Sequence, residues 1–329
     1  MRAGVRKILV TGGAGFIGSA FCRLLWRKGA DFCVVDALNY AADSARFERR
    51  KPRLWRADIA DYARLERVFA RERPRMVAHF AAQTHVDRSI KSAQEFIRAN
   101  VVGTEALLSL SKEYGVERFL HVSTDEVYGD ILRGKFREDS PVNPSSPYSA
   151  SKAAADLLVR SYVRTYAFPA VIVRPCNNYG PWQYQEKFIP RAILMLLLGK
   201  KIPIFASGRN VREWLYVEDC AQALLQVLRK GRLGEVYNLG SGEERENISV
   251  AADILKIFGL GRQRMEFVPD RPGHDVRYSL DSAKLRGETG WQPKVRPQDG
   301  LRMTVNWCVK HKRWLLAKAK EVEALYRCP

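Results

Sequence analysis

The chain has 329 residues, of which 46% are hydrophobic, a length and composition that suit a folded protein of about two domains. Lys and Arg total 55 against 36 Asp and Glu, so the formal net charge is +19. This surplus is compatible with a nucleic-acid partner, with a surface that attracts a small anionic substrate, or with an arginine-rich composition that has no function. Because no zinc-finger or RNA-recognition motif accompanies the charge, we expect no nucleic-acid partner.

The apolar segments are too short to cross a membrane. The run at residues 192–198 has seven residues, where about 20 are needed. The first residues lead directly into a strand-like segment without the apolar core of a signal peptide, so we expect a cytoplasmic protein with no membrane partner. The six cysteines form no CxxC pair and no cluster with histidine, which argues against a metal site and against a disulfide framework.

Short apolar segments alternate with helical segments through the first half of the chain. Strands are predicted over residues 7–11, 32–36, 76–80, 118–123 and 170–174, and helices over 19–28, 62–71, 92–114 and 148–166. Strands that are apolar throughout are typical of a parallel sheet covered on both faces. The pattern therefore predicts an α/β protein with a doubly wound parallel sheet, the Rossmann architecture.

The second half of the chain is interrupted by prolines and is expected to form a smaller α/β domain that binds the substrate. We assign residues 1–176 to the Rossmann domain, and residues 213–240 are expected to return to it with a helix at 215–228 and a strand at 236–239. Residues 177–212 and 241–329 make the second domain. Its last stretch, residues 300–326, is predicted to be one long basic helix. The simplest interpretation of this helix is a solvated surface helix without a specific function.

A glycine-rich segment follows the first predicted strand and begins the first helix. Gly12, Gly15 and Gly18 have a spacing that allows a tight turn and a close approach of the backbone to a dinucleotide diphosphate, which the helix N-terminus attracts. Asp36 ends the next strand, where a carboxylate binds ribose hydroxyls and repels a 2′-phosphate, so NAD is favoured over NADP. The alternative for Asp36 is a capping or loop residue. Asp58 follows a further strand-like stretch and could bind the adenine amino group.

Tyr148 and Lys152 form a YxxxK pair, and their spacing puts both side chains on one face of a helix. An ammonium near a phenol lowers the phenol pKa from about 10, and a phenolate can take a proton from an alcohol while hydride passes to a nicotinamide. The pattern is common on exposed helices. Here the segment STDEVYG at residues 123–129 ends a predicted strand, at the edge of the sheet where such folds bind ligands.

The segments TGGAGFIG, STDEVYG and YSASK together resemble the extended short-chain dehydrogenase/reductase superfamily. Within it, residues 7–307 resemble the nucleotide-sugar 4,6-dehydratases, with dTDP-glucose as the favoured substrate. The triplet at residues 124–126 is the specific part of the resemblance, because related epimerases usually have small residues there. Further matching segments are residues 85–90, 174–181, 186–190, 212–219 and 271–275.

The resemblance implies a lyase that makes a 4-keto-6-deoxy sugar through NAD, which stays bound and is regenerated in each turnover. Tyr148, beside Lys152, takes the 4-hydroxyl proton as hydride leaves C4, and Thr124 binds the reacting hydroxyl. Glu126 then removes the C5 proton, Asp125 protonates the departing C6 hydroxyl, and hydride returns to C6. One carboxyl must stay protonated beside an ionised partner, which two adjacent carboxyls in different environments can achieve. Both can face one pocket only if the strand ends before them.

Other residues are assigned by the same resemblance. Asn100 is implied to support a water relay from Lys152, and a homodimer is implied through the helices at 92–114 and 148–166. Arg212 and Arg271 are both implied to bind the diphosphate or nucleoside of the substrate. Arg212 suits phosphate because its guanidinium is a planar fork, whereas Arg271 could instead pair with Asp270 or Asp275. The remaining cofactor residues are Phe16, Ile17, Asp58, Ile59 and Ala81. The remaining substrate residues are His85, Ser123, Thr124, Asn177, Lys187, Asn247 and Tyr278.

Some features leave the substrate open. Gln83 and Thr84 stand where bacterial enzymes more often have Glu and Ser, and they resemble the rhamnose-synthase type that acts on UDP-glucose. The segment between Asp36 and Asp58 is also shorter than usual. The alternative enzymes are a UDP-sugar 4-epimerase and a UDP-glucuronate decarboxylase, neither of which removes a C6 hydroxyl. A dinucleotide-binding regulator would be expected to lack the Tyr–Lys pair or the carboxylates.

Overall fold

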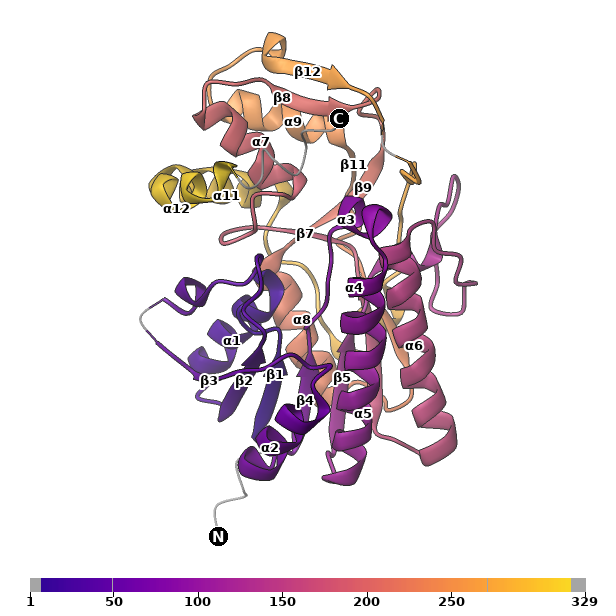
Figure 1. Cartoon of the computed structure of the whole chain (residues 1–329). Helices are drawn as coiled ribbons and strands as arrows, with labels where there is room; N and C mark the ends of the chain where they lie inside the picture. The colour runs from indigo at the N-terminus through magenta and orange to yellow at the C-terminus, as the bar shows by residue number, and fades with distance from the viewer. Residues whose placement is uncertain (1–6, 49, 271, 321–329) are drawn as a thin grey trace.

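The computed structural model describes residues 7–48, 50–270 and 272–320. A seven-stranded sheet with helices on both faces makes the larger part of the molecule, and two small sheets with their own helices make the smaller part (Figure 1). The predicted doubly wound α/β fold is confirmed.

All strands of the large sheet run parallel. Their order is β10-β6-β5-β4-β1-β2-β3. The bounds are β1 Ile8–Thr11, β2 Phe32–Asp36, β3 Arg53–Arg56, β4 Met76–His79, β5 Arg118–Val122, β6 Ala170–Pro175 and β10 Val236–Leu239. The chain leaves β1 towards β2 on one side and reaches β4 on the other, so a crevice opens at the carboxyl ends of β1 and β4, where such sheets bind ligands.

Helices cover both faces of this sheet, which explains why its strands are apolar throughout. Val10 and Val34 pack against α1 and α8 on one face, and Leu9 and Val35 pack against α2 and α5 on the other. The first face is covered by α1 (Phe16–Arg27), α8 (Val217–Lys230) and α10 (Ala283–Thr289). The second face is covered by α2 (Tyr62–Glu72), α5 (Gly103–Glu113) and α6 (Pro147–Tyr166).

The helix predicted at residues 92–114 is divided into segments. After α3 (Val86–Lys91) and an extended Ser92, it comprises α4 (Gln94–Phe96), one wider π-helical turn at Ile97–Val102, and α5. Asn100 lies in the wide turn, where its Oδ1 accepts from the Gln83 backbone N–H at 2.8 Å and its Nδ2 donates to the Gln83 carbonyl at 3.0 Å. Such turns are frequent at functional sites.

The smaller part contains a three-stranded sheet and a two-stranded sheet around a second apolar core. The strands are β7 (Asn177–Tyr179), β9 (Val211–Tyr216) and β11 (Glu244–Glu246) in one sheet, and β8 (Ile202–Phe205) and β12 (Met265–Val268) in the other. The helices are α7 (Phe188–Leu197), α9 (Asn247–Ile257), α11 (Pro297–Lys310) and α12 (Lys312–Ala317). Strand β9 continues directly into α8, so the chain returns to the large sheet without a linker.

The prediction of one long helix over residues 300–326 is wrong. The helix breaks at His311, between α11 and α12. The His311 ring stacks on Trp307, with the ring centroids 4.2 Å apart, and its Nδ1 lies 2.9 Å from the Trp307 carbonyl oxygen. The Trp307 carbonyl also accepts from the His311 backbone N–H at 2.9 Å, so the last turn of α11 is still closed where the backbone departs from helical geometry. Residues 321–326 lie outside the described residues.

No helix within the described ranges is long and apolar enough to span a membrane. Those ranges also contain no group of three or more His, Cys, Asp or Glu side chains that could hold a metal ion. The five described cysteines are buried and form no disulfide, while Cys328 lies outside the described residues.

Candidate active site

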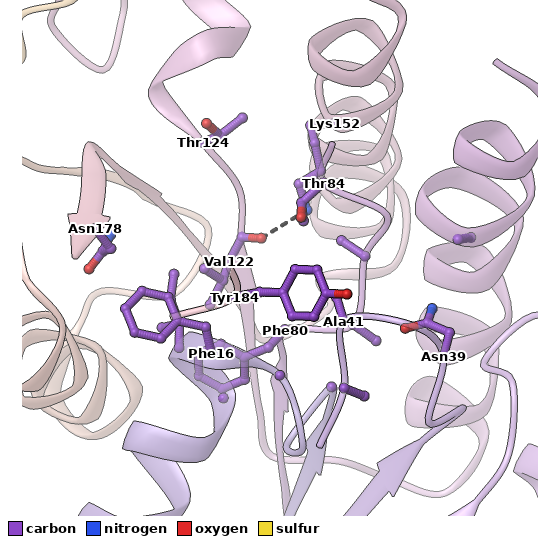
Figure 2. Close-up of a pocket in the computed structure, with 18 of the residues that line it drawn as sticks. Phe16, Asn39, Ala41, Phe80, Thr84, Val122, Thr124, Lys152, Asn178 and Tyr184 are labelled. Carbon is purple, nitrogen blue, oxygen red and sulfur yellow. Dashed lines mark hydrogen bonds between the residues drawn. The ribbon is translucent and has the colours of Figure 1, made fainter. Parts of the chain in front are cut away.

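A cavity of about 300 Å³ opens at the carboxyl ends of the central strands. Figure 2 shows its wall, with Phe16 and Phe80 on one side and Thr124 and Lys152 on another. Predicted cofactor residues in the lining are Gly12, Gly15, Phe16, Ile17, Gly18, Asp36, Asp58, Ile59 and Ala81. The lining also contains Ser123, Thr124, Asp125, Glu126, Tyr148, Lys152, Asn177 and Lys187. The structure therefore brings these predicted cofactor residues together with these predicted catalytic and substrate residues in one cavity.

The glycine-rich turn is packed so closely that side chains are excluded from it. Gly12 has a φ of +67°, and a Cβ there would lie 2.5 Å from the Ala81 backbone nitrogen. A Cβ on Gly18 would overlap the Gly12 carbonyl oxygen. Helix α1 begins after Gly15 without a side-chain cap, so its first N–H groups stay available at the cavity. This cradle fits the diphosphate of a dinucleotide.

Asp36 ends β2 at the edge of the cavity. Its Oδ2 accepts from the Ala14 backbone N–H at 2.9 Å, and its Oδ1 accepts from the Leu38 N–H at 2.8 Å. Burial raises the pKa of Asp36, and these two hydrogen bonds oppose the rise. The carboxylate therefore braces the loops on either side of it while it lines the cavity. Asp58 also lines the cavity, and its Oδ2 lies 3.1 Å from Arg98.

Helix α6 presents Tyr148 and Lys152 to the cavity. A capping box of Ser146 and Ser149 fixes its start, and both functional side chains are buried. The Lys152 Nζ donates to the Val122 carbonyl at 2.9 Å (Figure 2). Burial lowers the pKa of Lys152 to about 8. Burial and then the charge of Glu126 raise the pKa of Tyr148, so the lowering that sequence reasoning attributes to Lys152 is not found here.

The two adjacent carboxyls face the cavity because β5 ends at Val122. Thr124 is extended, and a 3₁₀ helix at Asp125–Tyr128 then turns Asp125 and Glu126 to the same side. The Thr124 Oγ1 donates to Asp125 Oδ1 at 3.3 Å, and Asp125 Oδ2 has no hydrogen-bond partner among the described residues. Burial, and next the charge of Glu126, raise the pKa of Asp125 well above its ordinary value. The pair can thus hold one proton on Asp125.

A second cavity, of about 160 Å³, adjoins the first and shares Glu126, Asn177 and Lys187 with it. Its wall also contains His85, Arg212 and Asn247, so six of the predicted residues meet there. The Lys187 Nζ donates to the Thr84 carbonyl at 2.8 Å. This second cavity extends the first one into the smaller part of the molecule.

Arg212 and Tyr278 form a unit at the side of the second cavity. Arg212 donates to the carbonyls of Val211, Asp275 and Val276, and its guanidinium lies 4.2 Å from the centre of the Tyr278 ring. Tyr278 does not line either cavity, and its hydroxyl donates to the Asp275 carboxylate. Tyr278 therefore packs against the Arg212 guanidinium without lining the cavity itself.

One further predicted residue, Asn100, is not at the cavities. Asn100 is absent from both linings, since its amide is used by the Gln83 backbone and by Ser151, whose Oγ it reaches at 2.8 Å. Arg271 lies outside the described residues, and so do its possible pairings. Sequence reasoning also missed Arg46, Thr84, Tyr184 and Glu186 in the first cavity. Glu186 stands beside Lys187 in a matching segment, which could have pointed to it, whereas Arg46 carries no such signal.

Comparison with known proteins identifies the family. A family model described as GDP-mannose 4,6 dehydratase matches residues 9–304. The chain belongs to this family. The dTDP-glucose 4,6-dehydratase of Neisseria meningitidis serogroup B is 47% identical, spanning 94% of this chain and 95% of the relative. That of Streptomyces niveus is 45% identical, spanning 94% of each chain. The predicted resemblance to nucleotide-sugar 4,6-dehydratases is confirmed.

Solved structures of the dehydratase family and of epimerases share the fold. A double mutant of the dTDP-glucose 4,6-dehydratase DesIV from Streptomyces venezuelae, with NAD bound, has a TM-score of 0.90 and 42% identity, covering 93% of this chain and 98% of its own. The UDP-glucose 4-epimerase of Thermus thermophilus, in complex with NAD, has a TM-score of 0.87 and 32% identity, covering 93% and 99%. Because the epimerase has the same fold, site residues must decide between the reactions.

Proposed function

We propose that the protein is an NAD-dependent dTDP-glucose 4,6-dehydratase, a lyase that forms a 4-keto-6-deoxy sugar nucleotide. The observation that carries the proposal is the pair Asp125 and Glu126, both in the cavity that Tyr148 and Lys152 line. Neither an epimerase nor a decarboxylase removes a C6 hydroxyl, so neither reaction needs this acid–base pair. The named relatives, at 45–47% identity, support the same choice.

The first cavity has the groups that would hold NAD. The glycine cradle and the start of α1 suit its diphosphate, Asp36 suits a ribose, and Asp58 with Ile59 suits the adenine. NAD bound by these residues would supply the acceptor for the hydride that leaves C4 and the donor for the hydride that returns to C6.

Tyr148 is the proposed base for the 4-hydroxyl. Since burial raises its pKa, the phenol loses its proton only with positive charge nearby, and Lys152 supplies such a charge from the same face of α6. Thr124, which follows the end of β5, is the proposed hydrogen-bond partner of the hydroxyl and would keep it in line with the phenol oxygen. Tyr148 and Lys152 are buried, which limits the contact of both groups with bulk water.

Asp125 and Glu126 are the proposed acid and base of the elimination. Asp125, which burial keeps protonated, gives its proton to the C6 hydroxyl, which departs as water. Glu126 takes the C5 proton, which the neighbouring 4-ketone has made acidic, and the C5 electron pair forms the C5–C6 double bond. The two carboxyls thus exchange their protonation states during this step.

The second cavity is the proposed site of the nucleotide part of the substrate. His85, Asn177, Lys187, Arg212 and Asn247 line it, and cationic side chains suit a diphosphate. Tyr278 acts through Arg212.

The proposal is tested by incubating the protein with dTDP-glucose and determining the molecular mass of the product by mass spectrometry. A product lighter by one water supports the dehydratase. UDP-, GDP- and CDP-glucose are compared at equal concentration, and preferential dehydration of UDP-glucose would move the assignment to the UDP-glucose type. A product of unchanged mass, or no product from any of these sugars, would refute the proposal.

We further propose a cytoplasmic homodimer. Apolar side chains are exposed on the α4–α5 segment and on α6, where Ile97 is 52% and Leu157 57% exposed. Light scattering after gel filtration would show the dimer, and Leu157→Glu should yield the monomer. A monomer for the unchanged protein would exclude it.

A further inference from the structure

Arg46 places a buried cation in the wall of the first cavity. Its Nε donates to the Trp182 carbonyl at 3.0 Å, and its Nη1 donates to the carbonyls of Ala14 and Ala41 at 2.7 and 2.5 Å. These carbonyls belong to three different loops, one of which is the glycine-rich loop. The remaining nitrogen, Nη2, is buried and has no hydrogen-bond partner among the described residues.

The charge of Arg46 is not neutralised by an ion pair with any described residue. Burial lowers the pKa of Arg46 to about 10, and the carboxylates of Asp43 and Asp36 oppose this from a distance. The guanidinium is therefore still charged at neutral pH. A buried charge with an unused donor is unfavourable unless something pairs with it. An anion in the adjoining cavity would do so.

Helix α12 holds the segment that carries Arg46. The Trp314 Nε1 donates to Asp43 Oδ2 at 2.7 Å, and the Trp314 ring lies 5.9 Å from the Arg46 guanidinium. Trp314 also meets the Trp182 ring edge-on, at 5.2 Å between centroids. The Asp43 N–H in turn donates to the Ala14 carbonyl at 3.0 Å. We call the set of Trp314, Asp43, Arg46 and Ala14 the Arg46 clamp.

We propose that Arg46 is an additional cofactor-binding residue, whose free Nη2 donates to the phosphates of NAD, and that α12 holds it in position through Trp314. Guanidinium groups bind phosphate oxygens strongly, and the clamp fixes this one at the loop that suits the diphosphate. The inference rests on the proposed function, because it requires NAD as the bound dinucleotide. Tight binding of NAD suits a reaction in which the same NAD molecule takes part in both hydride transfers.

The test measures NAD affinity by calorimetry on protein from which bound nucleotide has been removed. Arg46→Met keeps the aliphatic stem and should weaken NAD binding by about tenfold or more, since it removes a charged hydrogen bond. Trp314→Phe keeps a ring but loses the bond to Asp43, and should weaken NAD about threefold, roughly the worth of an ordinary hydrogen bond. Arg137→Met, at an exposed arginine away from the cavity, should leave the affinity unchanged.

ADP and adenosine separate a phosphate contact from a general effect on loop shape. Arg46→Met should weaken ADP by a similar factor to NAD and leave adenosine unchanged. Equal losses for ADP and adenosine, or wild-type NAD affinity in Arg46→Met, would overturn the inference. Should Arg46→Met fail to fold, Trp314→Phe decides by the same comparison. Failure of the unchanged protein to bind NAD would instead refute the proposed function itself.

Discussion

Lys152 on α6 donates from Nζ to the carbonyl oxygen of Val122, the last residue of β5, at 2.9 Å. This bond joins the helix that carries Tyr148 to the strand end that precedes Thr124, Asp125 and Glu126. This buried contact thus helps to fix the two groups proposed for proton transfer relative to each other. A substitution at Lys152 is expected to disturb both.

Replacing Tyr148 by Phe should stop the first step and leave NAD binding intact. The ring still fills the same buried space, while the proton acceptor is lost, so turnover should fall by about 10²–10⁴ or more. Product formation is followed by mass spectrometry and bound NAD by extraction. Oxidation of the sugar at the wild-type rate in this variant would show that Tyr148 is not the base.

Replacing Glu126 by Gln should block the reaction after the sugar has been oxidised. The amide keeps the shape of Glu126 but cannot take the C5 proton, so reduced cofactor should accumulate on the enzyme. Its near-ultraviolet absorbance in a single turnover is the readout. Glu266→Gln, at an exposed glutamate on β12, is the matched control. A variant that releases product without this accumulation would contradict the assigned role.

The first step should depend on pH through Lys152. Burial lowers the pKa of Lys152 to about 8, so its ammonium predominates below that pH and the neutral amine above it. Because loss of a proton from Tyr148 needs the positive charge, the rate should decline as pH rises through about 8. The check is to measure the rate of cofactor reduction by rapid mixing across pH 6–10, which extends roughly two pH units to either side of the Lys152 pKa. A rate that still rises above pH 9, which is about one unit above the Lys152 pKa, would exclude this dependence.

Gly18→Ala should prevent the glycine-rich turn from closing. The added methyl group would overlap the backbone oxygen of Gly12, which cannot move aside without shifting the loop. We expect NAD affinity to be lost and thermal stability to fall. Gly287→Ala in α10 is the matched control, because a Cβ there meets nothing within 4 Å, and it should stabilise the protein by about 0.5–1 kcal/mol. Similar behaviour of the two variants would contradict the packing argument.

Asp156→Asn should destabilise the fold. Asp156 is buried on α6, and its Oδ2 accepts from Arg174 Nε at 2.8 Å. The variant leaves Arg174 buried and unpaired, at a loss of about 3–5 kcal/mol in the free energy of unfolding. Burial alone would raise the pKa of Asp156, but the His121 imidazole, whose Nε2 lies 3.4 Å from Asp156 Oδ1, and the charge of Arg174 lower it to about 2.

This lowered pKa gives the pH dependence a definite sign. The stabilisation by Asp156 is fully present above its ordinary pKa near 3.8 and is lost as pH falls towards about 2. Denaturant unfolding of the wild type and of Asp156→Asn at pH 7 and at acid pH checks both statements. Asp139→Asn, at an exposed carboxylate, serves as the control. Equal unfolding free energies of wild type and Asp156→Asn at pH 7 would contradict the argument.

Features set by local spacing could be predicted from the sequence. The strand at Phe32–Asp36, the glycine turn and the Tyr148–Lys152 face follow from periodicity and from backbone requirements within a few residues. Features set by long-range contacts could not. Arg46 reaches the cavity only because α12 and the loop at Trp182 fold onto it. The break at His311, where the imidazole stacks on Trp307, is also not revealed by helical periodicity.

The direct passage from β9 into α8 has a consequence for how the protein is made. The buried face of α1, with Phe21, Leu24 and Leu25, is covered by α8, which comes far later in the chain. During synthesis the ribosome releases α1 long before Val217–Lys230 exists to shield it. The nascent N-terminal half therefore carries an uncovered apolar surface, and its folding must wait for contacts of large sequence separation.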